Sequence, residues 1–152
     1  MNINYIDYSI ATKSLDIFFA GCNNKCEDCC NPELIPFENG TDYVEVLPKI
    51  DKYLKEYASL IKNIFLVGGS PNHQNPEDLE IFMEGLRRRC HGIKIFLFCG
   101  EELDKVQEIF KKDCDFIKCG AYIPSLKCDD NIQQGIKLAT SNQKIYEKGK
   151  DY

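Results

Sequence analysis

The sequence predicts an α/β fold built on parallel β-strands. Short apolar blocks typical of buried strands alternate along the chain with segments whose apolar residues recur at helical spacing. Such alternation implies parallel strands joined by right-handed helical crossovers. The 152 residues are enough to bury a sizeable core and fit one domain, so we expect residues 1–152 to form a single domain.

The strands are predicted from short runs of β-branched and aromatic residues that end at turn residues. Leu15–Ala20 is the first strand and stops at Gly21, and Ile64–Val67 is the second and stops at Gly68. Further strands are predicted at Ile93–Phe98, Asp115–Lys118 and Gln143–Tyr146. The first four of these strands are expected to lie parallel in one sheet.

Three helices are predicted between the strands. Apolar residues at helical spacing run through Thr41–Asn63, although Pro48 indicates that the main helix starts near that residue. Asn75 is a natural N-cap for a second helix that starts at Pro76, and a third is predicted over Glu101–Lys112. The apolar face of the second helix carries Leu79, Phe82, Met83, Leu86 and Cys90.

The most informative motif is a run of three cysteines directly after the first strand. Cys22, Cys26 and Cys29 have three and then two residues between them. Three sulfurs from one short loop can each hold one iron of a cubane [4Fe-4S] cluster and leave the fourth iron without a protein ligand. An electron-carrying cluster or a closed structural zinc site normally needs a fourth ligand. We therefore predict that these three cysteines are the metal ligands of a [4Fe-4S] cluster with an open iron.

The other six cysteines are expected to play different parts. Cys30 follows directly on Cys29, and adjacent side chains in a turn diverge, so we interpret Cys30 as a wall residue near the cluster and not as a fourth ligand. The remaining five have no short paired spacing and are predicted to be small buried apolar residues, with a second cluster as the alternative. They are Cys90, Cys99, Cys114, Cys119 and Cys128.

A glycine pair, Gly68-Gly69, follows the second predicted strand. The missing side chains allow a ligand to approach the backbone, although a tight turn without a ligand would explain the pair equally well. In parallel α/β folds the loops at the C-terminal ends of the strands form the site, so this turn and the cysteine loop should converge. His73, in the loop after the turn, could line the same site.

Composition limits the partners and the compartment. The net charge is -5 and the sequence pI is near 5.1, which argues against a large cationic surface for binding nucleic acid or an anionic membrane. Nine cysteines and no signal-like segment at the start predict a reducing cytoplasm, and no apolar run reaches membrane-spanning length. The three arginines stand together at positions 87–89, either as a solvated helix face or as a docking patch for an acidic partner.

The segment from Gly21 to Asn31 resembles the cluster loop of the radical S-adenosylmethionine (SAM) enzymes, whose signature is this cysteine spacing. More narrowly, it is similar to the activating proteins of anaerobic ribonucleotide reductases. These carry a glycine before the first cysteine and an asparagine two residues after the third, the places of Gly21 and Asn31. Thr140–Tyr146 resembles the closing segment of the same proteins. Asp28 stands beside the third cysteine, where many radical SAM loops have an aromatic residue.

The resemblance implies a shortened, incomplete β/α barrel with SAM on the open iron. The glycine turn then resembles the segment with which these enzymes hold the amino group of SAM. The family usually has an acidic residue where Ser70 stands, so we expect weaker SAM binding, because a hydroxyl lacks the charge of a carboxylate. The implied SAM-binding residues are Asp28, Cys29, Cys30, Asn31, Gly68, Gly69, Ser70 and Pro71.

The resemblance also implies the reaction and the partners. One electron from a flavodoxin or ferredoxin would cleave SAM, and the resulting radical would create a glycyl radical on the large anaerobic ribonucleotide reductase. The cofactors supply this chemistry, and the protein supplies orientation. The alternatives are an activase of another glycyl-radical enzyme, a small radical SAM enzyme with another substrate, and a non-catalytic iron-sulfur or zinc-binding protein.

Overall fold

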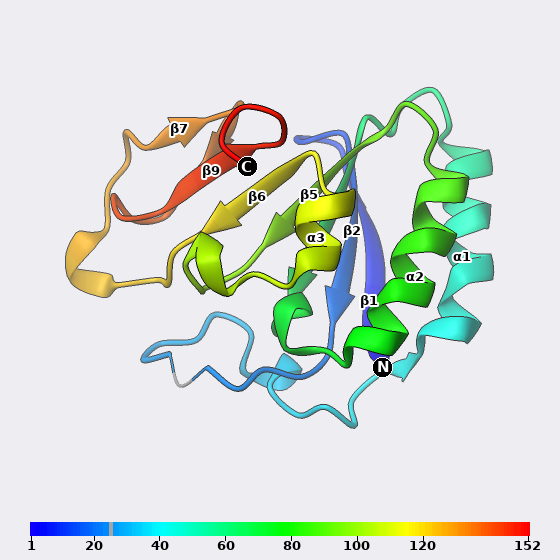
Figure 1. Ribbon diagram of the computed structural model, residues 1–152, viewed down its shortest axis with the longest axis horizontal. Helices are drawn as coiled ribbons and strands as arrows, with labels where there is room; N and C mark the ends of the chain where they lie inside the picture. Colours follow the sequence, from blue (N-terminus) through cyan, green and yellow to red (C-terminus); the bar gives the residue numbers. More distant parts are fainter. Residues whose placement is uncertain (25) are drawn as a thin grey trace.

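Figure 1 shows the computed structural model of the protein, which describes residues 1–24 and 26–152. The predicted α/β class is confirmed: a seven-stranded sheet in the order β3-β1-β2-β4-β5-β6-β9 packs against helices. Its strands are β1 (Asn2–Ser9), β2 (Ser14–Phe19), β3 (Thr41–Asp42), β4 (Asn63–Gly68), β5 (Lys94–Phe98), β6 (Phe116–Cys119) and β9 (Lys144–Glu147). A separate hairpin consists of β7 (Ile132–Gln133) and β8 (Ile136–Lys137).

The centre of the sheet is parallel, as predicted, but its two sides are not. β2, β4, β5 and β6 are parallel neighbours. In contrast, β1 pairs antiparallel with β2 and β3, and β9 pairs antiparallel with β6. The expectation that the strands of the incomplete barrel are parallel therefore needs correction, because the sheet is mixed. The sheet stays open between its edge strands β3 and β9. The sequence analysis missed β1, whose alternating burial around Ile3 is the signal it overlooked.

Each face of the sheet has its own apolar cluster. The larger cluster lies between the sheet and the helices α1 (Tyr43–Glu56), α2 (Pro76–Arg89) and α3 (Glu108–Asp113). The smaller cluster lies on the other face and is built from the three stacked or edge-packed rings of Phe65, Phe96 and Phe116, with Leu138 and Ile145 from the C-terminal segment. The short 3-10 helices are Pro32–Leu34, Pro71–His73, Leu103–Lys105 and Pro124–Leu126.

Helix α2 forms as predicted, whereas α1 starts earlier than Pro48. The side chain of Asn75 accepts hydrogen bonds from the first amides of α2, as expected of an N-cap. Helix α1 begins at Tyr43 because the side chain of Asp42 caps the amide of Val44. Pro48 then lies inside α1 on its exposed side, where the carbonyl that lacks its usual amide donor can bind water.

The helix predicted over Glu101–Lys112 is broken in the structure. It consists of the 3-10 turn Leu103–Lys105 and the short α3. The break occurs at Gln107, whose amide N–H donates to the side chain of Asn72 instead of to a helical carbonyl. The side-chain amide of Gln107 also donates to the backbone carbonyls of Asn72 and Gln74. A tertiary hydrogen-bond set has therefore replaced two turns of helix.

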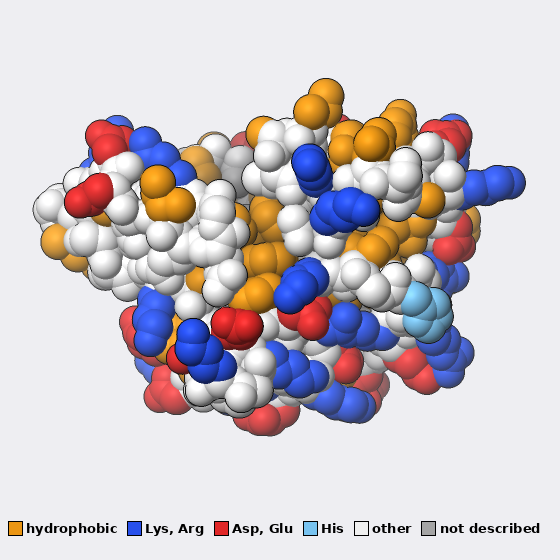
Figure 2. Space-filling model, turned by 90° about the horizontal axis from the view of Figure 1, so that it is seen from above, with side chains coloured by type: hydrophobic (Ala, Val, Ile, Leu, Met, Phe, Trp, Pro, Cys, Tyr) orange, Lys and Arg blue, Asp and Glu red, His pale blue; other side chains and the backbone are white. Residues whose placement is uncertain are grey.

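Figure 2 looks onto the end of the molecule away from the cysteine loop, where Lys and Arg side chains are interspersed with Asp and Glu. Each of the three clustered arginines has an acidic partner within the chain: Arg87 with Asp115, Arg88 with Glu84 and Arg89 with Asp51. These pairs favour the solvated, structural interpretation of the arginine cluster. Among the helices of the described residues, none has the length and apolar character needed to cross a membrane.

Candidate functional site

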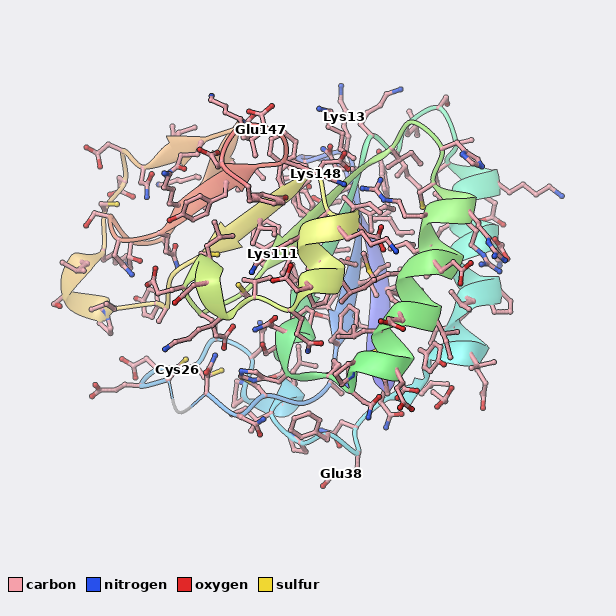
Figure 3. All side chains as sticks on the ribbon, in the orientation of Figure 1. Lys13, Cys26, Glu38, Lys111, Glu147 and Lys148 are labelled. Atoms are coloured by element: carbon pink, nitrogen blue, oxygen red, sulfur yellow. The ribbon has the colours of Figure 1, made fainter. Side chains whose placement is uncertain are left out.

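The parallel strands β2, β4, β5 and β6 end at the same edge of the sheet, and the loops that follow them surround one cavity of about 590 Å³. The cysteine loop follows β2, the glycine turn closes β4, Cys99 and Gly100 follow β5, and Gly120 follows β6. The predicted convergence of the cysteine loop and the Gly68-Gly69 turn is thus confirmed. Figure 3 shows Cys26 in this loop, at the end of the molecule opposite to Lys13.

All three predicted ligands and the neighbouring Cys30 line the cavity. Cys26, Cys29 and Cys30 are exposed, and Cys22 is partly buried. Burial raises the pKa values of Cys22 and Cys26, and neighbouring cysteine sulfurs raise them further. A metal centre that binds these sulfurs must therefore displace protons.

The cysteine loop and the glycine turn are joined through their backbones. The amide of Ser70 donates to the carbonyl of Gly21 at 2.8 Å, and the amide of Gly21 donates to the carbonyl of Leu34 at 2.8 Å. A Cβ atom on Gly69 would lie 2.6 Å from the Gly21 carbonyl oxygen and 2.7 Å from that of Leu34. Gly69 is therefore required for this close approach, which explains the second glycine of the pair.

Gln74 reinforces this junction and was missed by the sequence analysis. Its buried side-chain amide donates to the carbonyls of Ala20, Gly21 and Ser70 at 2.8, 3.4 and 3.1 Å. One side chain thus holds the end of β2, the start of the cysteine loop and the glycine turn together. Nothing in the local sequence pattern distinguishes Gln74 from a polar loop residue.

The eight residues implied as SAM contacts divide into two groups. Six line the cavity: Asp28, Cys29, Cys30, Asn31, Gly68 and Gly69. Ser70 and Pro71 are buried behind the turn and do not belong to the lining. The Ser70 hydroxyl is 2% exposed and has no hydrogen-bond partner among the described residues. It is thus a buried polar atom left available for a donor.

Lys118 is a further cavity residue that the sequence analysis did not identify. It lies on β6, is only 9% exposed, and donates to the carbonyls of Gly120 at 2.7 Å and Cys99 at 3.4 Å. Burial lowers its pKa from the ordinary value of a lysine. An alternating strand pattern would have placed this side chain on one face of β6, but only the fold shows that this face is the cavity.

The later cysteines follow the prediction of small buried residues. Four of them, Cys90, Cys99, Cys114 and Cys119, are buried, and Cys128 is partly exposed. The sulfurs of Cys99 and Cys119 are 3.9 Å apart, and their hydrogen bond together with burial raises the pKa of Cys99. Buried cysteines of this kind are structural and unreactive.

The chain from 121 to 143 closes the remaining side of the cavity. Ala121, Tyr122, Lys127, Ala139 and Gln143 contribute to the lining. Gln143 is buried, and its side-chain oxygen accepts the amide of Ala139 at 3.0 Å. The segment that resembled a family closing segment therefore does form a wall of the site.

The donor set fits an iron-sulfur cluster better than a single metal ion. No three His, Cys, Asp or Glu side chains of the described residues meet closely enough to hold one ion. A cubane cluster has no such need, because it places its cysteine ligands on different irons. Three thiols from one loop beside a cavity of this size, with no fourth thiolate required, match that arrangement.

Comparison with known proteins gives the same class of site. A family model described as a 4Fe-4S single cluster domain matches residues 13–146, which include the cysteine loop, the parallel strands and β9. The fold and the site thus define an α/β protein of the 4Fe-4S single-cluster class.

Curated relatives narrow the class. The chain is 26% identical over 135 residues to the anaerobic ribonucleoside-triphosphate reductase-activating protein of Escherichia coli K12, covering 86% of this chain and 85% of the relative. It is 30% identical over 112 residues to the protein of the same name from Haemophilus influenzae, covering 70% and 72%. The chain belongs to the family of anaerobic ribonucleoside-triphosphate reductase-activating proteins.

Proposed function

We propose that this protein is a radical SAM activase that creates the glycyl radical of an anaerobic ribonucleotide reductase. Cys22, Cys26 and Cys29 would hold a [4Fe-4S] cluster, and SAM would occupy the rest of the cavity. The observation that carries the proposal is that three thiols of one loop and the Gly68-Gly69 turn line the same cavity. The names of the relatives support the choice of the reductase as the target.

The cluster, held by Cys22, Cys26 and Cys29, and SAM would supply the radical chemistry: reductive cleavage of SAM, followed by removal of a hydrogen atom from a glycine of the partner. The protein's own contribution is binding and orientation. The glycine turn lets a ligand approach the backbone, and the apolar side chains of Val67 and Phe98 line the cavity beside it and restrict water there.

The polar residues of the cavity suit the two charged ends of the methionine part of SAM. Lys118 offers a positive charge to the carboxylate, since its ammonium already donates to two carbonyls at the cavity and carries a further proton. The ammonium group would depend on backbone carbonyls of the turn, because no carboxylate stands at position 70 and the Ser70 side chain is buried outside the cavity lining. We therefore keep the prediction of weak SAM binding, with Ser70→Glu and Ser70→Asp as the variants that test it by titration.

The open sheet supports a polypeptide substrate. Because the sheet stops at β3 and β9 without closing, we propose that it is the incomplete barrel of the radical SAM type and that the reductase's glycine loop completes the site. We further propose that residues 1–152 act as one domain in the cytoplasm, with a flavodoxin or ferredoxin as electron donor.

The decisive experiment is electron paramagnetic resonance of anaerobically reconstituted, reduced protein with and without SAM, together with an iron count. We expect four irons per chain and a cluster signal that SAM changes. Lys118→Met should retain the iron. It should raise the SAM concentration needed for half of the signal change about tenfold, because one charge-assisted contact is lost. Lys112→Met, an exposed substitution outside the cavity, should behave as wild type.

Two outcomes would overturn the proposal. A cluster signal that ignores saturating SAM would leave an electron-carrying or binding protein, and zinc in place of iron would leave a structural metal site. If SAM changes the signal, the reduced protein should then produce a glycyl radical when it is mixed with the anaerobic reductase.

A further inference from the structure

A short hydrogen-bond chain links the cysteine loop to the loops after β4 and β5. Glu101 Oε1 lies 2.7 Å from His73 Nε2 and accepts from the side-chain amide of Asn24 at 2.9 Å. His73 Nδ1 accepts from the backbone amide of Asn23 at 2.9 Å. Asn23 and Asn24 lie between two predicted ligands, Cys22 and Cys26, so the chain of bonds ends inside the proposed cluster-binding segment.

The two ring nitrogens of His73 face different partners. Nδ1 accepts the backbone N–H of Asn23, which leaves Nε2 as the nitrogen that faces Glu101. Both side chains are largely enclosed, with 15% of His73 and 13% of Glu101 exposed. Hydrogen bonds to a charged, enclosed carboxylate are among the stronger ones in proteins.

The residue before Glu101 also lies against the cysteine loop. Gly100 is fitted to the same contact, since a Cβ there would lie 3.0 Å from the side-chain nitrogen of Asn24. The β5 loop is therefore close to the segment that joins these two cysteines.

We propose that Glu101 and His73 are positioning residues that hold residues 23 and 24 in place and so preset Cys22 and Cys26 for the cluster. This inference rests on the proposed function of those cysteines. The loop after β5 would thus help to position the metal ligands, although neither Glu101 nor His73 lies in the cavity lining. The described residues of the cysteine loop, 22–24 and 26–29, lie in no helix or strand, so the contacts of residues 23 and 24 with His73 and Glu101 are what fix this part of the loop.

The first test measures the loop without metal. Amide exchange of Asn23, followed by nuclear magnetic resonance in the full-length apo protein, reports the hydrogen bond to His73 directly. We expect Glu101→Ala and His73→Ala to speed this exchange about fivefold, the effect of losing one hydrogen bond. Glu101→Gln should restore slow exchange, because its carbonyl oxygen can still accept both donors.

Glu102→Ala is the matched control, since Glu102 is the next residue, is exposed, and has no side-chain cap bond. It should leave exchange unchanged. Asn24→Ala removes the hydrogen bond to Glu101 from the side of the cysteine loop, and we expect it to speed the exchange of Asn23 about twofold. This variant keeps the proposal testable even if Glu101→Ala fails to fold. Wild-type exchange in Glu101→Ala and Asn24→Ala, or equal acceleration by Glu102→Ala, would overturn the proposal.

The second test uses the reconstituted protein and follows iron loss to a chelator. Glu101→Ala should lose iron about fivefold faster than wild type, and Glu101→Gln should stay within twofold. Iron loss at the wild-type rate in Glu101→Ala would overturn the positioning role. If the wild type takes up no cluster while Asn23 exchange responds as expected, the proposed function fails and the hydrogen-bond clamp on the loop remains.

Discussion

Cysteine occurs in two regions of this protein, and the two regions use different properties of the thiol. In the loop after β2, Cys26, Cys29 and Cys30 are exposed beside a cavity. In the helix-covered core, Cys90 and Cys114 are buried among apolar side chains, and burial raises their pKa values. The comparison teaches that exposure and clustering, not the number of cysteines, decide where a metal centre can form.

The largest effect should come from removing one loop cysteine. Cys26→Ser is expected to abolish a stable [4Fe-4S] cluster, because two thiolates from the protein cannot hold three corners of a cubane. Cys30→Ser, an equally exposed neighbour on the same cavity, should retain nearly full iron. Iron and sulfide analysis after anaerobic reconstitution measures both variants, and equal losses would mean that Cys30 is a ligand.

A second contrast concerns glycine in the same two regions. Gly69→Ala should lower the free energy of unfolding by about 1–3 kcal/mol, because its Cβ would collide with two backbone carbonyls that cannot move aside. Gly85→Ala in α2 should raise it by about 0.5–1 kcal/mol, since the nearest atom is the flexible end of Arg89 and alanine favours a helix. Urea titration of the apo proteins gives both values. A neutral Gly69→Ala would show that the close junction of the two loops is not needed for folding.

The buried core cysteines should matter for stability and not for iron. Cys114→Ala is expected to cost about 1 kcal/mol, because it leaves a small gap in a fully buried site. Its iron content after reconstitution should equal that of wild type. Loss of iron from a stably folded Cys114→Ala protein would contradict the division between the two regions.

A further effect appears only at alkaline pH, where the stability of the fold should depend on pH. Burial raises the pKa of Cys90 from 9.0 to about 12, so the folded state keeps a proton that the unfolded state releases. Unfolding then becomes easier as pH rises from 9 toward 12, with a slope of at most about 1.4 kcal/mol per pH unit from this thiol. Urea titrations at pH 8 and pH 10 should show a smaller loss in Cys90→Ala than in wild type. An identical loss would show that Cys90 does not titrate in this window.

Much of the fold could be predicted because its signals are local. The apolar runs of β2, β4, β5 and β6, and the Asn75 cap of α2, depend on neighbouring residues in the chain. One error was a local capping signal that was overlooked, and another arose where a distant contact outweighed local preference. Asp42 starts α1 before Pro48, and the hydrogen bonds of Gln107 to Asn72 break the predicted third helix.

For the same reason, only part of the candidate site could be predicted from the sequence. The cysteine spacing and the glycine pair are visible in the chain, and both line the cavity. Lys118, Gln74 and Glu101 lie in three separate segments, and each acquires its role only where the strand ends meet. No spacing rule connects such residues, whose contacts include Gln74 with Ala20 and Glu101 with Asn24, 54 and 77 positions apart.

The sequence by itself determined the kind of chemistry, because three closely spaced thiols, two glycines and alternating strands and helices are properties of short stretches. Only the tertiary structure decided what surrounds that chemistry. It buried Ser70 behind the turn, brought Lys118 into the cavity, and tied Asn23 and Asn24 to His73 and Glu101. The physical reason is that burial and hydrogen bonding between distant segments are set by how the strands stack, which no local pattern specifies.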